Sequence, residues 1–260
     1  MSMDAAAVIL AAGVGSRLRP LTSVRPKALC PVGGALLVDR AIARARRHTQ
    51  DVAVNVHHHR EQMEDHLRGR VHLSIEPRLM GTAGALGAIR DWIDGRPVLL
   101  LNADAYHDDD LSALIAGWDG ECARLLTVDA RRPADFGTLR YTGAALLPWA
   151  VVAKLPPHPS GLADMVFYPL HRDGDLQLVR STRAFYDCGT VASYHAANMH
   201  ASGGAPVIEP GAQIDGVAVR SVVWSGASVP AGERLVNAVR ARDDLTVYVD
   251  SVARAETSSS

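Results

Sequence analysis

The 260-residue sequence has little of what would place it in a specialised class of protein. Its three cysteines, Cys30, Cys122 and Cys188, are odd in number, far apart and without a C-x-x-C pair. They fit free thiols in a reducing compartment better than a disulfide framework. Lys and Arg (27) nearly balance Asp and Glu (28), so no basic excess points to nucleic acid and no polybasic tract to a membrane surface.

Long hydrophobic runs are lacking as well. No stretch approaches the ~20 apolar residues of a membrane helix. Residues 5–12 are apolar, but they lack a cationic flank and lead directly into glycines, unlike a signal peptide. Because 48% of the residues are hydrophobic, the chain can bury a core of one large domain, or one and a half. We therefore expect a cytoplasmic globular protein.

The most informative stretch is an apolar strand that leads into a glycine-containing, cationic loop, LAAGVGSRLRPLTSVRPKALCPVGG from Leu10 onward. Gly13 and Gly15 lack the Cβ that keeps a ligand away from the backbone, and exposed N–H groups in such a loop suit phosphate oxygens. Arg17 and Lys27 add the positive charge that a triphosphate needs. The loop is neither a Walker A motif nor G-x-G-x-x-G. The alternative is a structural turn with surface cations.

Apolar periodicity predicts alternating strands and helices over the first two hundred residues. The predicted strands are 52–56, 71–75, 97–101, 124–129 and 141–147, and the longer predicted helices are 35–47, 61–67, 83–93, 111–118 and 191–200. This order predicts an α/β fold with a Rossmann-like, mixed but mostly parallel sheet sandwiched by helices. Ligands bind at the carboxyl ends of such strands, and both Gly13 and Asp104 follow a predicted strand end.

From Gly203 onward the pattern changes, because apolar residues recur every six positions. They are Ile208 and Ile214, then Val217, Val223, Val229 and Leu235 after a shift of three. This period predicts a short left-handed parallel β-helix over residues 203–250, after a catalytic domain of residues 1–202 and before a disordered tail of residues 251–260. A solenoid this short must pack on the catalytic domain or on another subunit, and the second option makes a homo-oligomer.

Two aspartates are candidates for a metal site. Asp104 and Asp187 each follow a predicted strand, and Mg²⁺ is bound by one or two carboxylates together with substrate phosphates. A lone Asp after a strand is more often a cap or turn residue. We interpret His57-His58-His59 as a corner between a strand and a helix, because alternate side chains of an extended segment point to opposite sides. Asp108-Asp109-Asp110 is interpreted as a solvated helix start.

Four segments resemble the signature of sugar-1-phosphate nucleotidyltransferases. They are the string from Leu10, Gly81-Thr82-Ala83-Gly84-Ala85-Leu86 after Glu76-Pro77, Leu100-Leu101-Asn102-Ala103-Asp104, and Tyr186-Asp187-Cys188-Gly189-Thr190. The resemblance covers residues 5–202. The motif form is most like that of mannose-1-phosphate guanylyltransferases and is near that of uridylyltransferases that recycle cell-wall amino sugars.

The resemblance implies that a nucleoside triphosphate, with GTP favoured, and a sugar 1-phosphate similar to mannose 1-phosphate give a nucleoside diphosphate sugar and pyrophosphate, with Mg²⁺ as cofactor. It implies catalytic roles for Arg17, Lys27 and Asp104, metal binding by Asp104 and Asp187, and sugar-phosphate binding by Gly137 and Asp187. The implied nucleotide-binding residues are Leu10, Ala11, Ala12, Gly13, Gly15, Ser16, Arg17, Lys27, Gly81, Thr82 and Asn102.

One segment departs from the family pattern. Members usually carry Glu-Lys-Pro after a Phe-Gly motif, whereas here Phe136-Gly137 leads almost directly into Tyr141. The next lysine, Lys154, lies in a predicted helix and is not given the role. Three alternatives therefore stay open: UTP with an amino-sugar phosphate, a heptose or cyclitol phosphate as acceptor, or a non-catalytic regulatory subunit that binds a sugar nucleotide.

Overall fold

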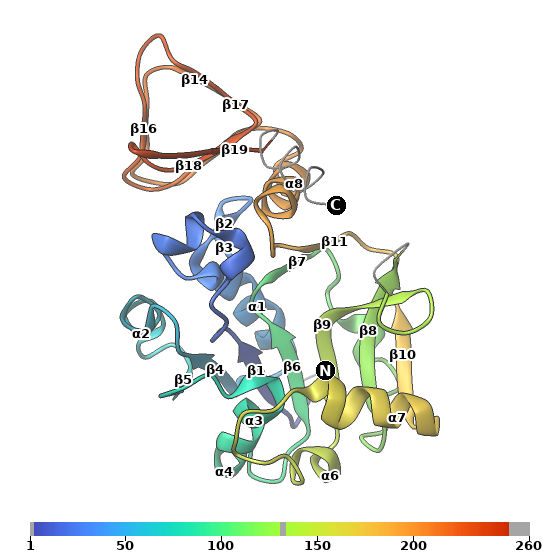
Figure 1. Cartoon of the computed structure of the whole chain (residues 1–260). Helices are drawn as coiled ribbons and strands as arrows, with labels where there is room; N and C mark the ends of the chain where they lie inside the picture. Colours follow the sequence, from blue (N-terminus) through green and yellow to red (C-terminus); the bar gives the residue numbers. More distant parts are fainter. Residues whose placement is uncertain (1–2, 131–133, 250–260) are drawn as a thin grey trace. The chain divides into compact units, whose positions relative to one another are not determined.

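The computed structural model describes residues 3–130 and 134–249 and divides into two compact units (Figure 1). The first, called here the sheet unit, contains the chain up to Gly13 and Val38–Phe185. The second, called the loop–solenoid unit, contains Val14–Leu37 and the chain from Tyr186 onward. The division therefore does not follow the predicted boundary at residue 202, because the cationic loop belongs to the same unit as the solenoid. The predicted tail of residues 251–260 lies outside the described residues.

A seven-stranded sheet in the order β10-β8-β9-β6-β1-β4-β5 forms the centre of the sheet unit. Its strands are β1 (Ala6–Leu10), β4 (Val52–Val56), β5 (His72–Ile75), β6 (Val98–Asn102), β8 (Ala123–Asp129), β9 (Leu139–Leu147) and β10 (Leu176–Arg180). Only β9 is antiparallel to its neighbours, β6 and β8, and the other pairs are parallel. The predicted large, mixed, mostly parallel sheet with helices is confirmed.

The other elements of the sheet unit connect these strands. They are α1 (Leu37–Arg46), α2 (Arg60–Leu67), α3 (Gly81–Ala88), α4 (Arg90–Ile93), β7 (Ala105–His107), α5 (Ser112–Ile115), α6 (Trp149–Val152), the π-helical η4 (Ala163–Phe167) and α7 (Tyr168–Asp173), while β11 (Phe185–Asp187) spans the division. The predicted helix 83–93 is in fact two, because the chain leaves helical geometry at Ile89. Sequence periodicity missed β10 and β7.

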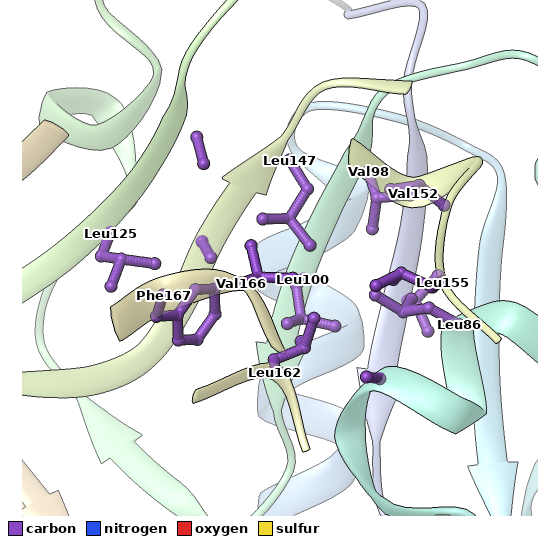
Figure 2. Packing of buried hydrophobic residues seen from close by; sticks show 14 of the residues in the cluster. Leu86, Val98, Leu100, Leu125, Leu147, Val152, Leu155, Leu162, Val166 and Phe167 are labelled. Carbon is purple, nitrogen blue, oxygen red and sulfur yellow. The ribbon is translucent and has the colours of Figure 1, made fainter. Parts of the chain in front are cut away.

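Apolar side chains from the sheet and from the segments beside it make up the core of the sheet unit. Figure 2 shows Val98 and Leu100 of β6 beside Leu147 of β9, with Leu86 of α3 and Phe167 of η4 against them. All five are fully buried or nearly so. Removal of such side chains from water is the main favourable contribution to folding, and it fixes α3 against the sheet.

Three glycines at intervals of three residues, Gly81, Gly84 and Gly87, form one face of α3. A Cβ on Gly84 would lie 2.2 Å from the carbonyl oxygen of His158, and one on Gly87 would lie 2.4 Å from that of Pro156. The backbone of residues 155–160 therefore rests directly on the helix. At Gly84 and Gly87, the close approach that glycine permits is used by this chain's own backbone.

This packing predicts that Gly87→Ala destabilises the protein. Alanine favours a helix over glycine by about 1 kcal/mol, but here its Cβ would meet backbone atoms that cannot shift easily. We expect the free energy of unfolding to fall by about 2 kcal/mol, measured by chemical denaturation. The matched control is Gly161→Ala, whose Cβ would meet only Asp164 Oδ2, at 3.7 Å. Equal stability of the two variants would contradict the prediction.

The loop–solenoid unit begins with short elements around the cationic loop. These are the 3₁₀ turns η1 (Ser16–Leu18), η2 (Leu21–Ser23) and η3 (Lys27–Leu29), and the hairpin of β2 (Pro31–Val32) and β3 (Ala35–Leu36). The helix α8 (Val191–Ala201) starts at a capping box, in which the Thr190 side chain accepts a hydrogen bond from Ser193 N. The Asn198 side chain of α8 accepts from Gly33 N and donates to the Pro31 carbonyl (3.1 Å each). The helix thus holds the hairpin.

Stacked short strands form the rest of this unit. The parallel stacks are β12 (Val207–Ile208), β15 (Val222–Val223) and β18 (Ala238–Arg242); β13 (Gln213–Ile214) and β16 (Ser228–Val229); and β14 (Val217–Val219) and β17 (Arg234–Val236). The antiparallel β19 (Leu245–Tyr248) follows β18. In Figure 1 the stacks trace a three-sided course, coloured orange to red.

The six-residue period thus matches the strand positions of a parallel solenoid. The second-turn residues Val223 and Val229 are fully buried, whereas Ile208 and Ile214, with which they pair in the first turn, are each 37% exposed. On the third side the fully buried Leu235 pairs with Ala218, and the predicted Val217, which is 48% exposed, pairs with Arg234. The predicted period is therefore one residue out of register on that side. The predicted left-handedness of the solenoid and its role in a homo-oligomer stay predictions. Among the described residues, no helix is long and apolar enough to cross a membrane.

Candidate functional site

The carboxyl ends of three neighbouring strands meet at one edge of the sheet. Leu10, the last residue of β1, is paired in register with Asn55 of β4 and with Asn102 at the end of β6. A pocket of about 250 Å³ lies there, lined by Leu10, Ala12, Gly13, Asn55, Glu76, Leu79, Gly81, Thr82, Asn102 and Asp104. Seven residues predicted for nucleotide or metal binding therefore line a single pocket, although they come from three distant parts of the sequence.

A buried polar network fixes the wall of this pocket. Asn55 Oδ1 accepts a hydrogen bond from Ala11 N (2.6 Å), and Asn55 Nδ2 donates to Glu76 Oε1 (2.8 Å). The other Glu76 oxygen accepts from Met80 N (3.0 Å). Asn55 and Glu76 are each only 4% exposed. The network joins the start of the glycine loop to the start of α3, and it gives the predicted residue Ala11 an intramolecular partner for its N–H.

Sequence reasoning did not assign a role to Asn55 or Glu76. The signal was the asparagine within the otherwise apolar strand Val52-Ala53-Val54-Asn55-Val56, because a polar side chain in a buried strand requires a hydrogen-bond partner. Its partner is 21 residues away, and nothing local in the sequence identifies it.

Gly81 and Thr82 line the pocket and also hold a second segment of the sheet unit. The Thr82 hydroxyl accepts a hydrogen bond from Leu162 N (2.8 Å). Gly81 has φ +68°, and a Cβ there would lie 2.4 Å from the Ser160 carbonyl oxygen. Glycine is therefore required at this position both by its left-handed backbone conformation and by its close neighbour. The nucleobase role implied for this turn stays a prediction.

Asp104 follows β6, and Tyr141 lies near it on β9. Burial and the charge of Asp104 together raise the pKa of Tyr141 well above its ordinary value, so the phenol remains protonated at neutral pH.

Asn102 fits against β9 only because Gly143 has no side chain, since a Cβ there would lie 2.8 Å from Asn102 Cβ. The predicted sugar-phosphate residue Gly137 has φ +63° and lies in a turn of the sheet unit. It does not line the pocket.

Three predicted residues of the loop–solenoid unit come together as an ion-pair cluster. Lys27 Nζ lies 3.7 Å from Asp187 Oδ1, and Arg17 Nη2 lies 3.9 Å from Asp187 Oδ2. The Lys27 side chain is 8% exposed and that of Arg17 is 69% exposed. A buried ammonium group requires a counter-charge, and Asp187 provides it. The more exposed guanidinium group of Arg17 can reach a ligand.

Two glycines make this cluster sterically possible. A Cβ on Gly189 would lie 2.9 Å from both Arg17 Nη2 and Asp187 Oδ1. Gly15 has φ +64°, and a Cβ there would lie 2.9 Å from Thr22 Cγ2 and 3.2 Å from Lys27 Cβ. The predicted residue Ser16 starts η1 directly after this turn. Gly15 therefore shapes the loop so that its chain can fold back over the base of Lys27.

The remaining candidates do not line the pocket. The three histidines form the predicted corner, since β4 ends at Val56 and α2 starts at Arg60. Lys154 was expected within a helix, but α6 ends at Val152, two residues before it. Its exclusion from the sugar-phosphate role stays a prediction. Burial raises the pKa of the Cys30 thiol to about 12, which makes it a poor nucleophile.

Asp104 and Asp187 belong to different units, and their convergence on one metal ion stays a prediction.

Comparison with known proteins identifies related sequences and folds. A family model described as "Nucleotidyl transferase" matches residues 6–145. An N-acetylmuramate alpha-1-phosphate uridylyltransferase of Caulobacter vibrioides is 34% identical over 129 residues, which are 44% of this chain and 53% of that protein. A mannose-1-phosphate guanyltransferase of Neurospora crassa is 29% identical over 182 residues, which are 65% of this chain and 46% of that protein. This chain thus spans about half the length of these two relatives.

A solved structure supports the fold over nearly the whole chain. A structure described as a mannose-1-phosphate geranyltransferase from Thermus thermophilus superposes with a TM-score of 0.70 at 18% identity, and the match covers 98% of this chain and 100% of that one. At this identity the match supports the architecture alone. The family model contains the loop, Gly81, Thr82 and Asp104, whereas Asp187 lies beyond its last matched residue.

The pocket network predicts that Glu76→Gln destabilises the protein although the two side chains have nearly the same shape. Asn55 Nδ2 and Met80 N each require an acceptor, and glutamine has only one oxygen. If Asn55 turned its amide to compensate, Ala11 N would lose its acceptor. We expect the free energy of unfolding to fall by about 1–3 kcal/mol, measured by urea denaturation. The exposed Glu121→Gln is the matched control, and equal losses for both variants would contradict the interpretation.

Proposed function

Because the chain belongs to the nucleotidyl transferase family, we propose that it joins a nucleoside triphosphate to a sugar 1-phosphate, giving a nucleoside diphosphate sugar and pyrophosphate. The observation that carries the proposal is the pocket at the ends of β1, β4 and β6. Residues predicted for nucleotide binding line it together with Asp104. A pocket of this kind, at the carboxyl ends of parallel strands, is the usual ligand site of an α/β sheet.

In the proposed reaction, an oxygen of the sugar phosphate attacks the α-phosphorus in line. The bond from that phosphorus to the oxygen it shares with the β-phosphorus breaks, and pyrophosphate leaves. Arg17 and the loop N–H groups hold the β- and γ-phosphates, and Lys27 neutralises charge at the α-phosphate. Such a transfer depends on positioning and charge neutralisation. No general base is needed, because the attacking phosphate is already ionised at neutral pH.

The donor set fits Mg²⁺. Among residues 3–130 and 134–249, no group of three or more His, Cys, Asp or Glu side chains could hold a metal ion by itself. Mg²⁺ needs only one or two carboxylates when substrate phosphates and water complete its shell, and we assign these to Asp104 and Asp187. When bound, the ion would stabilise negative charge on the reacting phosphates. The contacts of Asp187 with Lys27 and Arg17 keep its carboxylate oriented.

For the substrates, the first candidate is GTP with a sugar 1-phosphate similar to mannose 1-phosphate. It is supported by the motif form and by the named guanyltransferase, whose match covers 65% of this chain. The second candidate is UTP with an amino-sugar 1-phosphate, supported by the 34% identity to the named uridylyltransferase. The missing Glu-Lys-Pro segment leaves the acceptor side shorter than in the family pattern and is compatible with either acceptor.

We expect Asp104→Asn to remove turnover while the fold is retained, because asparagine keeps the shape of the side chain without its charge. Loss of several kcal/mol of charge stabilisation corresponds to about a thousandfold or more in rate. Pyrophosphate release measures the effect, and the thermal shift that Mg²⁺ gives in the presence of triphosphate reports metal binding separately. The exposed Asp91→Asn is the control. Near-normal turnover of the Asp104 variant would remove the metal from the proposed chemistry.

A panel of triphosphates with Mg²⁺ distinguishes the candidate donors. A ligand that binds only the folded state raises the melting temperature according to its affinity. We expect the largest rise with GTP, and pyrophosphate release when mannose 1-phosphate is added. A larger rise with UTP, and release with N-acetylmuramate 1-phosphate, would favour the second candidate instead. Binding without release for any acceptor in the panel would identify a regulatory subunit and contradict the proposed activity.

A further inference from the structure

Arg25, one of the cations of the loop that starts at Leu10, contacts side chains of the solenoid. Arg25 lies two residues before Lys27 in sequence, and its Nη1 lies 3.1 Å and 3.0 Å from the two carboxylate oxygens of Glu209. Its guanidinium carbon lies 4.2 Å from the ring centroid of Trp224. Glu209 and Trp224 both belong to the solenoid, and all of these residues lie within one compact unit.

The Arg25–Glu209 pair is largely removed from water. The two side chains are 17% and 10% exposed, respectively. Ser225 N also donates to a Glu209 oxygen (3.0 Å), and Arg25 Nη1 also contacts the Leu29 carbonyl oxygen (3.4 Å). Loss of one member of such a pair leaves the other charge buried without compensation, which costs far more than loss of a surface pair. Unlike the exposed Arg17, Arg25 is committed to contacts inside the protein.

A second connection runs from the solenoid to the other side of Lys27. Trp224 is fully buried, and its Nε1 donates to the Tyr194 hydroxyl (3.1 Å). That hydroxyl donates to the Pro31 carbonyl oxygen (2.7 Å). Arg25 and Pro31 lie on either side of η3, which contains Lys27. The solenoid therefore fixes the chain before and after the lysine, through Glu209 and through Trp224.

A segment that is fixed on both sides, as residues 25–31 are, loses less conformational freedom when it binds a ligand, and such preorganisation increases affinity. We propose that Glu209 and Trp224 are positioning residues for the triphosphate. Through Arg25 and Tyr194 they hold the segment that carries Lys27, so the solenoid is required for triphosphate affinity and not only for stability. The inference rests on the proposed function, in which Lys27 contacts the triphosphate.

The solenoid contains a second Arg–Glu ion pair for comparison, in which the Glu233 side chain is 30% exposed, against 10% for Glu209. Arg240 Nη1 donates to Glu233 Oε2 (2.8 Å), and its partners, which also include the Ser228 carbonyl oxygen and the Thr246 hydroxyl, all lie within the solenoid. Glu209→Gln and Glu233→Gln therefore each weaken one Arg–Glu pair of the same unit. We expect only Glu209→Gln to loosen the segment that carries Lys27.

The two variants are compared by triphosphate affinity and by backbone exchange. Calorimetry with GTP and with UTP, in Mg²⁺ and without sugar phosphate, should show the dissociation constant rising about tenfold for Glu209→Gln and little changed for Glu233→Gln. In steady state, KM for the triphosphate should rise while KM for the sugar phosphate is retained. Hydrogen exchange without ligand should be faster over residues 14–30 in Glu209→Gln alone. Equal affinity and equal exchange in the two variants would overturn the inference.

A second variant keeps the test valid if Glu209→Gln fails to fold. Trp224→Phe keeps an aromatic face beneath Arg25 but loses the hydrogen bond to Tyr194, and we expect a smaller loss of affinity of about threefold, with faster exchange near Pro31. Wild-type affinity and exchange in this variant would contradict the role of Trp224. If the wild-type protein binds no triphosphate, the proposed function fails, whereas the exchange data still decide whether the solenoid holds the loop.

Discussion

The register of the parallel strands is the constraint on which the rest of the sheet unit depends. Leu10 is aligned with Asn55 of β4 on one side and with Asn102 of β6 on the other. The three strands therefore end at about the same level along the edge of the sheet. Ala11 N finds its acceptor in Asn55 of the neighbouring strand, and Ala103 N finds its acceptor in the Leu10 carbonyl (3.0 Å). A shift of one residue would turn each side chain to the opposite face. Strand pairing therefore brings the strand-end residues of the pocket together, and the loops that follow the strands supply the rest of its lining.

Glycine serves two different purposes around this pocket. At Gly15 and Gly81 the backbone has positive φ, and a Cβ would also meet a neighbouring atom. At Gly84 and Gly87 the helical backbone is ordinary, and glycine is needed because residues 155–160 pass directly over α3. The motif Gly81-Thr82-Ala83-Gly84 thus combines a turn at the pocket with a packing surface behind it. The same residue type gives no indication in the sequence of which purpose it serves.

Local patterns predicted most of the architecture, whereas they did not predict the long-range contacts. The apolar runs predicted β1, β4, β6, β8 and β9, and the six-residue period predicted the stacked strands. The loop and Asp104 were identifiable because their chemistry is contained in a short, distinctive string. By contrast, Arg25 and Glu209 are 184 residues apart, and neither has a neighbour that indicates the other. The short strand β10 was missed, and the helix at 83–93 proved to be two, because tertiary packing overrides weak local preference.

The cations of the loop do not all have the same counter-charge, and this difference connects the fold to the proposed chemistry. Arg25 forms a largely buried ion pair with Glu209 at 3.0 Å. Lys27 and Arg17 instead share Asp187 at 3.7–3.9 Å, which is longer than a direct hydrogen bond. A triphosphate brings several negative charges, and these can replace the weak contacts with Asp187 while the Arg25–Glu209 pair remains. In the proposed complex a divalent cation gives Asp187 a new counter-charge. In this proposal the buried Lys27 and the exposed Arg17 can exchange Asp187 for a ligand because another carboxylate, Glu209, holds the loop that carries them.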